Sequence, residues 1–437
     1  MATTYLSRTP SSAGNLKTFT ISAWVKRADI STTLGTLLLC SYTSAFNYTN
    51  FYIGSNDKLT VNSSGTGSSC FIETSRLFRD ASAWYHIVIA VDTTEGIASN
   101  RVKIYVNGVR ETSFASTTYF ASGVNTLINS TVSTNINRNQ YGTVQGSSSM
   151  SHFHFIDGTA YDASAFGSTD SVTGEWKINT SPSVTYGTNG FFILKDGNSV
   201  TDQSGEGNDF TVGGGTLTKT EDCPSNVFCT WNSLFRRGTI TPTFSNGNLT
   251  SNFTGGAQQF ALTSLGASSG KYYSEIKWVS SHGNAACITG ILDMAFSGTA
   301  DPNDAVTNAF GYFASGNKHI SGSSSSYGNS YSAGDIIGIA IDCDNSKLYF
   351  SKNGVYQNSG VPTSGSTGTG AIPIISGVTY GIYGSEYDGR IANLNTGNGY
   401  FGTTAVTSAG TNASGNGIFE YDVPTGFTAL STKGLNL

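Results

Sequence analysis

The chain has 437 residues, of which only 12% are charged, and its formal net charge at pH 7 is -5. Glycine occurs 53 times and aromatic residues make up 12% of the chain, a composition typical of short strands joined by tight turns. Because the sequence has no basic stripe, no long apolar segment and no apolar leader, we expect no nucleic-acid partner, no membrane insertion and no signal peptide.

Short alternating strands dominate the first half of the chain. The segment Phe19–Val25 places every second residue, beginning with Phe19, on one apolar side, and this period of two predicts a half-buried strand. Further short apolar runs, each bounded by Gly, Ser, Asn or Asp, occupy residues 36–40, 50–53 and 58–61. This spacing is typical of a β-sandwich.

One pattern occurs twice, once in each half. The apolar run Trp84–Asp92 is followed, after a polar insert, by a strand that ends in Asn107-Gly108. Much later, Gly334–Asp342 is followed by a strand that ends in Asn353-Gly354. Because Asn-Gly can adopt positive φ at both central positions, each pair predicts a type I′ hairpin turn. The repetition indicates two sandwich cores.

The sequence between the two patterns contains the expected boundary. Ser151–Gly158 alternates and predicts a further strand, whereas Gly213-Gly-Gly215 opens a polar stretch typical of a linker. We therefore predict an all-β chain with two antiparallel β-sandwich domains of the jelly-roll type in tandem. The predicted division is a first domain at residues 1–213, a linker at residues 214–239 and a second domain at residues 240–437.

The first predicted domain is similar to a known family. The segments Phe19–Trp24, Trp84–His86 and Ile104–Gly108, together with Asp92, resemble the laminin-G/pentraxin branch of the concanavalin A-like lectin/glucanase superfamily. The resemblance covers most of this half of the chain. It implies a sandwich of the kind found in lectins.

The second predicted domain is similar to another family. Gly270–Glu275, the pattern from Gly334 to Asn353-Gly354, and Pro424–Leu430 resemble a SPRY domain. The Asn-Phe-Gly segment of that family is replaced here by Asn393-Leu-Asn-Thr-Gly397, a departure that leaves the local turn open. The resemblance implies a second sandwich of a type that binds other molecules.

Several joining segments are similar to virus proteins. Phe155–Ala160, Gly174–Lys177, Tyr186–Phe191 and Asp222–Cys229 look like segments of virion proteins from tailed bacteriophages. This resemblance implies a structural or adhesion protein of the particle, synthesised in the host cytoplasm and located on the virion.

The lectin/glucanase resemblance raises the question of glycoside hydrolysis, which in retaining enzymes needs two carboxyl groups about 5 Å apart. The nearest match to the family's Glu-x-Asp-x-x-Glu strand is Glu386-Tyr-Asp388, and Ile391 stands where the second Glu would be. We therefore predict that the protein is not an enzyme. A depolymerase whose carboxylates come from different strands or subunits is the alternative.

Histidines and cysteines offer few metal or redox sites. His152 and His154 share one strand face and could hold a metal with a third ligand, but packing within the strand is the preferred interpretation, as it is for His86. Six cysteines are too sparse for a disulfide scaffold, so we expect reduced thiols, with a Cys223–Cys229 bridge as the alternative.

One loop has the oxygen-rich, glycine-rich composition of a calcium-binding turn, although ordinary turn residues explain that composition equally well. We expect no other cofactor. The calcium candidates are Asp196, Asp202, Asn208 and Asp209.

Aromatic residues in polar loops are the candidates for ligand binding. An aromatic ring surrounded by Ser, Asn and Gly gives rigid apolar area together with adaptable hydrogen bonding, which is the composition of recognition loops. Packing against the end of the sandwich or against a neighbouring subunit is the alternative. The candidates are Tyr42, Phe46, Tyr48, Tyr327, Tyr331 and Tyr387.

Together, the missing catalytic motifs, the aromatic loops and the phage-like segments predict a non-enzymatic virion adhesin. We expect a tail fibre or head appendage that binds glycan or protein on the host surface and assembles with other virion proteins and with itself. Because no heptad repeat occurs, a trimer would form through sandwich faces or exchanged strands. The alternative is a purely structural capsid-decoration or tail component that binds only other virion proteins.

Overall fold

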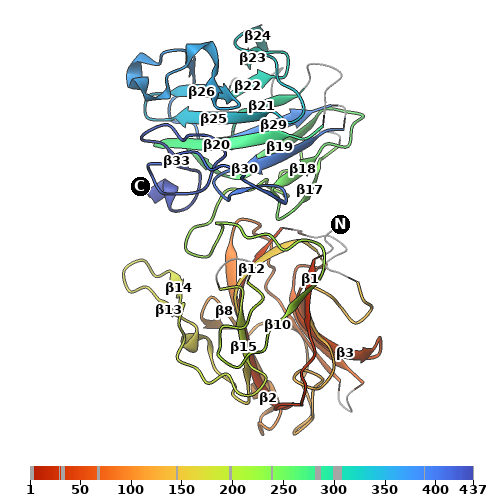
Figure 1. The fold of residues 1–437 in the computed structure, drawn as a ribbon. Helices are drawn as coiled ribbons and strands as arrows, with labels where there is room; N and C mark the ends of the chain where they lie inside the picture. The colour runs from red at the N-terminus through yellow and green to blue at the C-terminus, as the bar shows by residue number, and fades with distance from the viewer. Residues whose placement is uncertain are drawn as a thin grey trace. The chain divides into compact units, whose positions relative to one another are not determined.

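The chain forms two compact units, residues 1–219 and residues 220–437 (Figure 1). A computed structural model describes residues 4–28, 30, 35–65, 69–143, 146–195, 199–237, 240–280, 287–298, 308–387 and 389–436. Within these ranges no helix is long and apolar enough to cross a membrane. The helices described are short 3₁₀ turns at Ala98–Asn100, Ala163–Ala165, Gln357–Ser359, Pro362–Thr367 and Gly434–Asn436.

The first unit contains an eight-stranded sheet. Its ladders are antiparallel, and they join the beginning of the chain to the end of the unit because β1 pairs with both β11 and β16. The strand order is β10 (Phe114–Thr118), β6 (Cys70–Thr74), β5 (Leu59–Ser64), β4 (Asn47–Ile53), β3 (Thr36–Ser44), β11 (Thr134–Ile136), β1 (Tyr5–Arg8) and β16 (Thr211–Gly214).

A six-stranded sheet packs against the first. Side chains from both sheets share one core, with Phe51 from the first sheet and Ile21 and Ile89 from the second, each fully buried. The order of the second sheet is β15 (Phe191–Ile193), β12 (Ser148–Asp157), β2 (Thr18–Arg27), β7 (Trp84–Asp92), β8 (Val102–Val106) and β9 (Val109–Arg110). A separate hairpin joins β13 (Gly167–Thr169) and β14 (Trp176–Ile178).

Both predicted Asn-Gly hairpins are present. Asn107 and Gly108 have φ values of 48° and 80° between β8 and β9. Asn353 and Gly354 have φ values of 48° and 82° between β26 (Lys347–Lys352) and β27 (Val355–Tyr356). Positive φ at both central positions is the geometry that the I′ turn requires, so a local sequence signal determined these turns.

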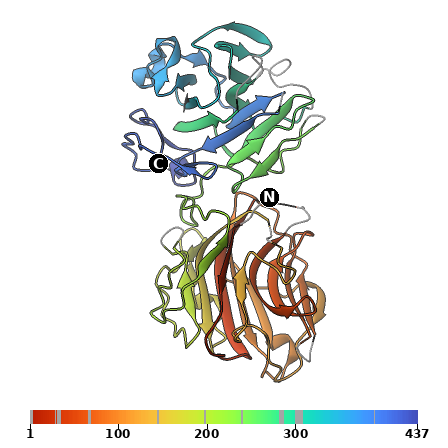
Figure 2. The same ribbon diagram turned by 45° about the vertical axis from the view of Figure 1, so that its right-hand side comes forward.

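The second unit is also made of two main sheets, which share a core that includes Trp278 and Ile291. In the larger sheet the late strand β30 lies beside the much earlier β20 (Figure 2). Its strands are β17 (Thr243–Ser245), β18 (Thr250–Asn252), β30 (Ile391–Asn395), β20 (Lys271–Trp278), β25 (Ile336–Asp342), β26 and β27, with β28 (Ile372–Pro373) on β26 and β33 (Thr428–Ala429) parallel to β20.

The smaller sheet of the second unit is antiparallel throughout its described ladders. A short additional pair joins β31 (Tyr400–Phe401) and β32 (Thr404–Ala405). The strand order of the smaller sheet is β19 (Gln259–Ala267), β29 (Tyr380–Glu386), β21 (Ile288–Asp293), β22 (Ala309–Phe313), β23 (Asn317–Ile320) and β24 (Ser323–Ser326).

The structure differs from the predicted linker at 214–239. The boundary between the units falls at residue 219, and the described residues 220–237 belong to the second unit. Trp231 is fully buried in the core of that unit, and its backbone N–H donates to the carbonyl of Asn248 at 3.0 Å. This stretch is mostly polar, but its few apolar side chains pack into the second sandwich and hold the stretch in place.

Candidate functional site

The β3–β4 hairpin presents an aromatic tip, as the sequence predicted for this loop. Tyr42 and Tyr48 face each other across the hairpin and are both half-buried, whereas Phe46 at the turn is 81% exposed. A hydrogen bond from Asn47 Nδ2 to Thr43 Oγ1, 2.7 Å long, stabilises the turn. The phenyl ring is thus held in water at the end of a supported hairpin.

Two other aromatic candidates are buried and are not at the surface. Tyr327 and Tyr331 are only 5% and 4% exposed and belong to the core of the second unit. The Tyr331 hydroxyl lies 2.9 Å from the Tyr312 carbonyl, and the Tyr327 hydroxyl accepts from the backbone N–H of Phe350 at 3.2 Å. Their Ser- and Gly-rich surroundings suggested a recognition loop, but the rings anchor that loop to the sandwich.

The segment that most resembled a glucanase strand lies partly in the interior. Glu386 is 1% exposed, and its carboxylate accepts from the Tyr387 backbone N–H at 2.9 Å and contacts the Cys287 thiol. Tyr387 is 45% exposed, so it stays a candidate for binding. Asp388, the other carboxylate of the match, lies outside the described residues.

The predicted calcium loop uses its oxygens in another way. The Asp202 carboxylate accepts four hydrogen bonds, two from backbone N–H groups of Phe192 and Asn208 and two from Ser204, at 2.7 to 2.9 Å. Asp209 Oδ1 accepts from the Asp202 backbone N–H at 2.7 Å. N–H and O–H donors therefore occupy both carboxylate oxygens of Asp202 and one oxygen of Asp209.

Of the two remaining calcium candidates, one is described by the structure. Asn208 is buried and its Oδ1 accepts from the Arg8 guanidinium, so a built-in cation occupies this position. Asp196 lies outside the described residues. Within the part of the chain that the structure describes, no group of three or more His, Cys, Asp or Glu side chains is placed to hold a metal ion.

Stacked rings surround His86 on the outer face of the six-stranded sheet. Its ring centroid lies 4.9 Å from that of Trp24 and 5.9 Å from that of Trp176. Because Nδ1 accepts from Trp176 Nε1 at 2.9 Å, the ring proton is on Nε2, which donates to Ser22 Oγ at 2.9 Å. Burial lowers the pKa of His86 to about 3, so this histidine is a neutral packing residue.

His154 on β12 is also a packing residue. His154 is 2% exposed, stacks on Phe192 with centroids 3.9 Å apart, and has its Nδ1 2.8 Å from the Tyr186 hydroxyl. Burial lowers its pKa well below the usual value. His152 takes a positive φ of 47° where the ladder to β2 shifts register. The preferred interpretation of these residues as packed strand residues is confirmed for His154.

A covering layer formed by residues 159–190 explains this burial. Apolar side chains of the layer, Ala163 and Phe166 among them, pack on Val88 and Ile156 of the six-stranded sheet. The layer includes the β13–β14 hairpin that carries Trp176 (Figure 1). Residues 159–190 therefore build part of the sandwich and are not a loose connection.

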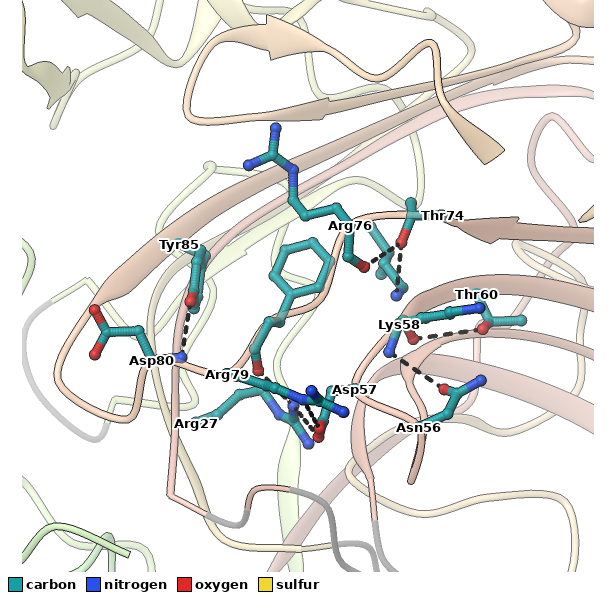
Figure 3. Close-up of polar contacts among 12 residues, drawn as sticks. Arg27, Asn56, Asp57, Lys58, Thr60, Thr74, Arg76, Arg79, Asp80 and Tyr85 are labelled. Atoms are coloured by element: carbon teal, nitrogen blue, oxygen red, sulfur yellow. Dashed lines mark hydrogen bonds and ion pairs between the residues drawn. The ribbon is translucent and has the colours of Figure 1, made fainter. Parts of the chain in front are cut away.

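A buried charge cluster escaped the sequence analysis. Figure 3 shows the guanidinium groups of Arg27 and Arg79 converging on the carboxylate of Asp57, with contacts of 2.8 Å each. Arg27 Nη1 also donates to the Phe78 carbonyl at 2.6 Å, and the side chains of Arg27 and Asp57 are fully buried. The cluster ties β2 to the turn before β5 and to the loop after β6, which is a structural task.

None of the six cysteines forms a disulfide in the structure, so the alternative Cys223–Cys229 bridge is absent. Cys229 is fully buried beside Trp231, whereas Cys223 is half-exposed. Burial raises the pKa of Cys40, Cys70 and Cys343 to about 12, which suits inert core thiols.

Comparison with known proteins identifies the two units. Residues 2–143 match the model of the concanavalin A-like lectin/glucanases superfamily, and residues 271–381 match the model of the SPRY domain. The chain therefore contains a laminin-G-type lectin-like domain followed by a SPRY domain, both β-sandwiches. Among curated proteins none matches the chain.

Solved structures of SPRY domains are also similar to the chain. The SPRY domain of human HERC1 is 18% identical, with a TM-score of 0.29, and the match covers 35% of this chain and 91% of that one. A second human SPRY domain is 17% identical, with a TM-score of 0.26, and the match covers 33% of this chain and 90% of that one.

Proposed function

We propose that the chain is a non-enzymatic adhesion protein of a tailed-bacteriophage virion, carried on a tail fibre or head appendage, that binds glycan or protein on the host surface. The main observation behind the proposal is that the Phe46 side chain is 81% exposed. It lies at the tip of a hairpin, between Tyr42 and Tyr48, and a hydrogen bond stabilises the turn. Rigid aromatic area surrounded by Ser, Thr and Asn is suited to contact with a polar partner surface.

The viral part of the proposal rests on the phage-like segments of the sequence. The lectin-like family model ends at residue 143, and the segments that resemble virion proteins follow it. These segments supply Trp176 and Tyr186, which pack on His86 and His154. An elaborated lectin-like sandwich joined to a SPRY domain is consistent with a protein that assembles with other virion proteins and with itself.

The test compares binding of the full chain and two variants to host cells and to an array of host-surface glycans. Phe46→Ala should weaken binding about tenfold or more, as expected for a central aromatic contact. Val172→Ala is the matched control, because Val172 is 91% exposed on a different turn of the same unit, and it should bind as the wild type does.

Two results would contradict the proposal. One is that multimerised wild-type protein binds no host cells and attaches only to other virion proteins, which is the behaviour of a purely structural component. The other is release of new reducing ends from host polysaccharide by the purified chain, which would make it a depolymerase.

A further inference from the structure

A polar pocket of about 450 Å³ opens in the first unit where β1 meets the turn that precedes β16. The antiparallel ladder between β1 and β16 brings these two segments together, although they stand at opposite ends of the unit's sequence. Gly207 in the turn has a positive φ of 74°, which exposes backbone at the rim. The lining residues are Ser7, Arg8, Thr9, Ser11, Gly207, Asn208, Asp209 and Thr211.

Two buried amides hold the Arg8 guanidinium in the pocket. Its Nη2 donates to Asn208 Oδ1 and, at 3.4 Å, to Asn189 Oδ1. Asn208 Nδ2 is fixed by the carbonyls of Thr188 and Gly190, at 3.0 and 2.7 Å. Asn189 is 3% exposed, and its own amide donates to a backbone carbonyl at 2.8 Å. The orientation of Arg8 is therefore set before any ligand arrives.

The donors that remain on Arg8 select the kind of acceptor. A guanidinium can bind a carboxylate or phosphate with two parallel hydrogen bonds through either of two edges, Nη1 with Nη2 or Nε with Nη2. Both edges need Nη2, and in Arg8 the Nη2 group already donates to the two Asn side chains. Nε and Nη1 make no hydrogen bond to the described residues, so they can still donate singly. Single donors suit separate hydroxyl oxygens better than a bidentate anion.

Asp209 provides the complementary acceptor. Its Oδ1 accepts from the Asp202 backbone N–H, while Oδ2 accepts no hydrogen bond from the described residues, and the side chain is exposed at the pocket. A carboxylate oxygen accepts hydrogen bonds from hydroxyl groups, and it repels a phosphate or carboxylate ligand. The fixed positive charge of Arg8 in turn disfavours a metal cation.

We propose that this pocket binds a neutral ligand with neighbouring hydroxyl groups, as found on one residue of a saccharide, with Arg8 donating and Asp209 Oδ2 accepting. This inference rests on the proposed function and gives the first unit a second contact point, apart from the aromatic hairpin. Ser11 and Thr9 also line the pocket and add to its polar character.

The test is saturation-transfer NMR on the full chain with the methyl glycosides of glucose, galactose and mannose, and a parallel titration with inorganic phosphate and with calcium chloride. At least one glycoside should receive saturation from the wild-type protein, and Asp209→Asn should weaken that binding about tenfold or more. The variant keeps the oxygen that accepts from Asp202, so its thermal midpoint should match the wild type.

Glu206→Gln is the matched control, because Glu206 is an exposed carboxylate on the same turn that does not line the pocket, and it should leave glycoside binding unchanged. If all three glycosides fail to bind, if Asp209→Asn binds them normally, or if only phosphate or calcium perturbs the amide signals of Gly207 and Thr211, the pocket proposal is wrong. Should wild type and Asp209→Asn nevertheless bind host cells equally, the proposed adhesion function stands without this pocket.

Discussion

Glu275 on β20 is a buried carboxylate that holds the late segment around residue 420 against the larger sheet of the SPRY unit. It accepts from the backbone N–H groups of Glu420 and Tyr421 at 3.0 and 2.9 Å. The Tyr273 hydroxyl and the Asn395 amide add contacts of 3.2 Å each. The four hydrogen bonds favour the ionised carboxylate and so lower the pKa of Glu275, whereas burial raises it. Burial has the larger effect and brings the pKa to about 7.

This raised pKa predicts a pH dependence of stability. In the unfolded chain Glu275 loses its proton near pH 4.5, whereas the folded unit keeps it to about pH 7. The contribution of Glu275 to stability is therefore full below pH 4.5 and declines as pH rises to about 7, by roughly 3 kcal/mol in total. Denaturant unfolding of the second unit at pH 5 and pH 7.5 measures it.

Glu275→Gln is the reference for that measurement, because it has no carboxyl group to titrate. The wild type should lose more stability than the variant between the two pH values. Equal losses would contradict the prediction. Should the variant fail to fold, the carbon-13 shift of the Glu275 carboxyl gives its pKa directly, and an ordinary value near 4.5 would refute the account.

Single residues also mark where sequence reasoning fails. Phe46 was identified correctly as an exposed loop aromatic, but Tyr331, in a similar polar context, is buried. Loop composition made Asp202 and Asn208 calcium candidates, but in the structure their oxygens accept hydrogen bonds from Arg8 and from backbone donors. Arg8 is far away along the chain, and composition within a loop carries no information about such a partner.

At the scale of elements, the layer of residues 159–190 covers the outer face of the six-stranded sheet and forms a second small core with it. Trp176 on β14 completes this core by stacking on His86 and by donating its indole N–H to it. Gly108 in the first Asn-Gly turn leaves room for the indole, since a Cβ there would lie 2.3 Å from Trp176 ring atoms. Turn geometry and layer packing thus depend on the same glycine.

Gly108→Ala should therefore destabilise the first unit through both strain and collision. Gly123→Ala is the matched control, because Gly123 also has a positive φ, of 73°, but its Cβ would meet nothing within 4 Å. Backbone strain alone costs about 1 to 2 kcal/mol in each variant. The collision should cost Gly108→Ala about 1 to 3 kcal/mol more. Unfolding followed by tryptophan fluorescence tests this, and equal losses in the two variants would show that Trp176 does not depend on Gly108.

Elements differ in how far local sequence determines them. The Asn-Gly hairpins and the existence of a strand at Phe19–Val25 were predictable because turn chemistry and a period of two are local signals. The prediction that this strand is half-buried was wrong, because both of its faces are buried. The covering layer was not, because its anchor Trp176 meets His86 only through the tertiary fold. The burial of Trp231, inside the stretch predicted as a linker, was not predictable for a related reason, since its burial site is formed by strands that come later in the chain.

At the scale of the whole molecule, the chain combines a lectin-like sandwich and a SPRY sandwich of nearly equal length. Each unit has its own core, and the exposed binding candidates of the first unit are the Phe46 hairpin and the Arg8 pocket. The fold class and the two family resemblances were predictable from sequence. The partner was not, because a scaffold of this kind accepts many ligands.

The central claim is that this chain is a virion component whose first unit contacts the host. An electron cryo-microscopy map of the particles that carry this protein tests the claim most directly. We predict density for both sandwiches on the tail or on a head appendage, with the Phe46 hairpin directed away from the particle. Absence of the chain from the particle, or a Phe46 hairpin buried against the capsid or tail, would contradict the account.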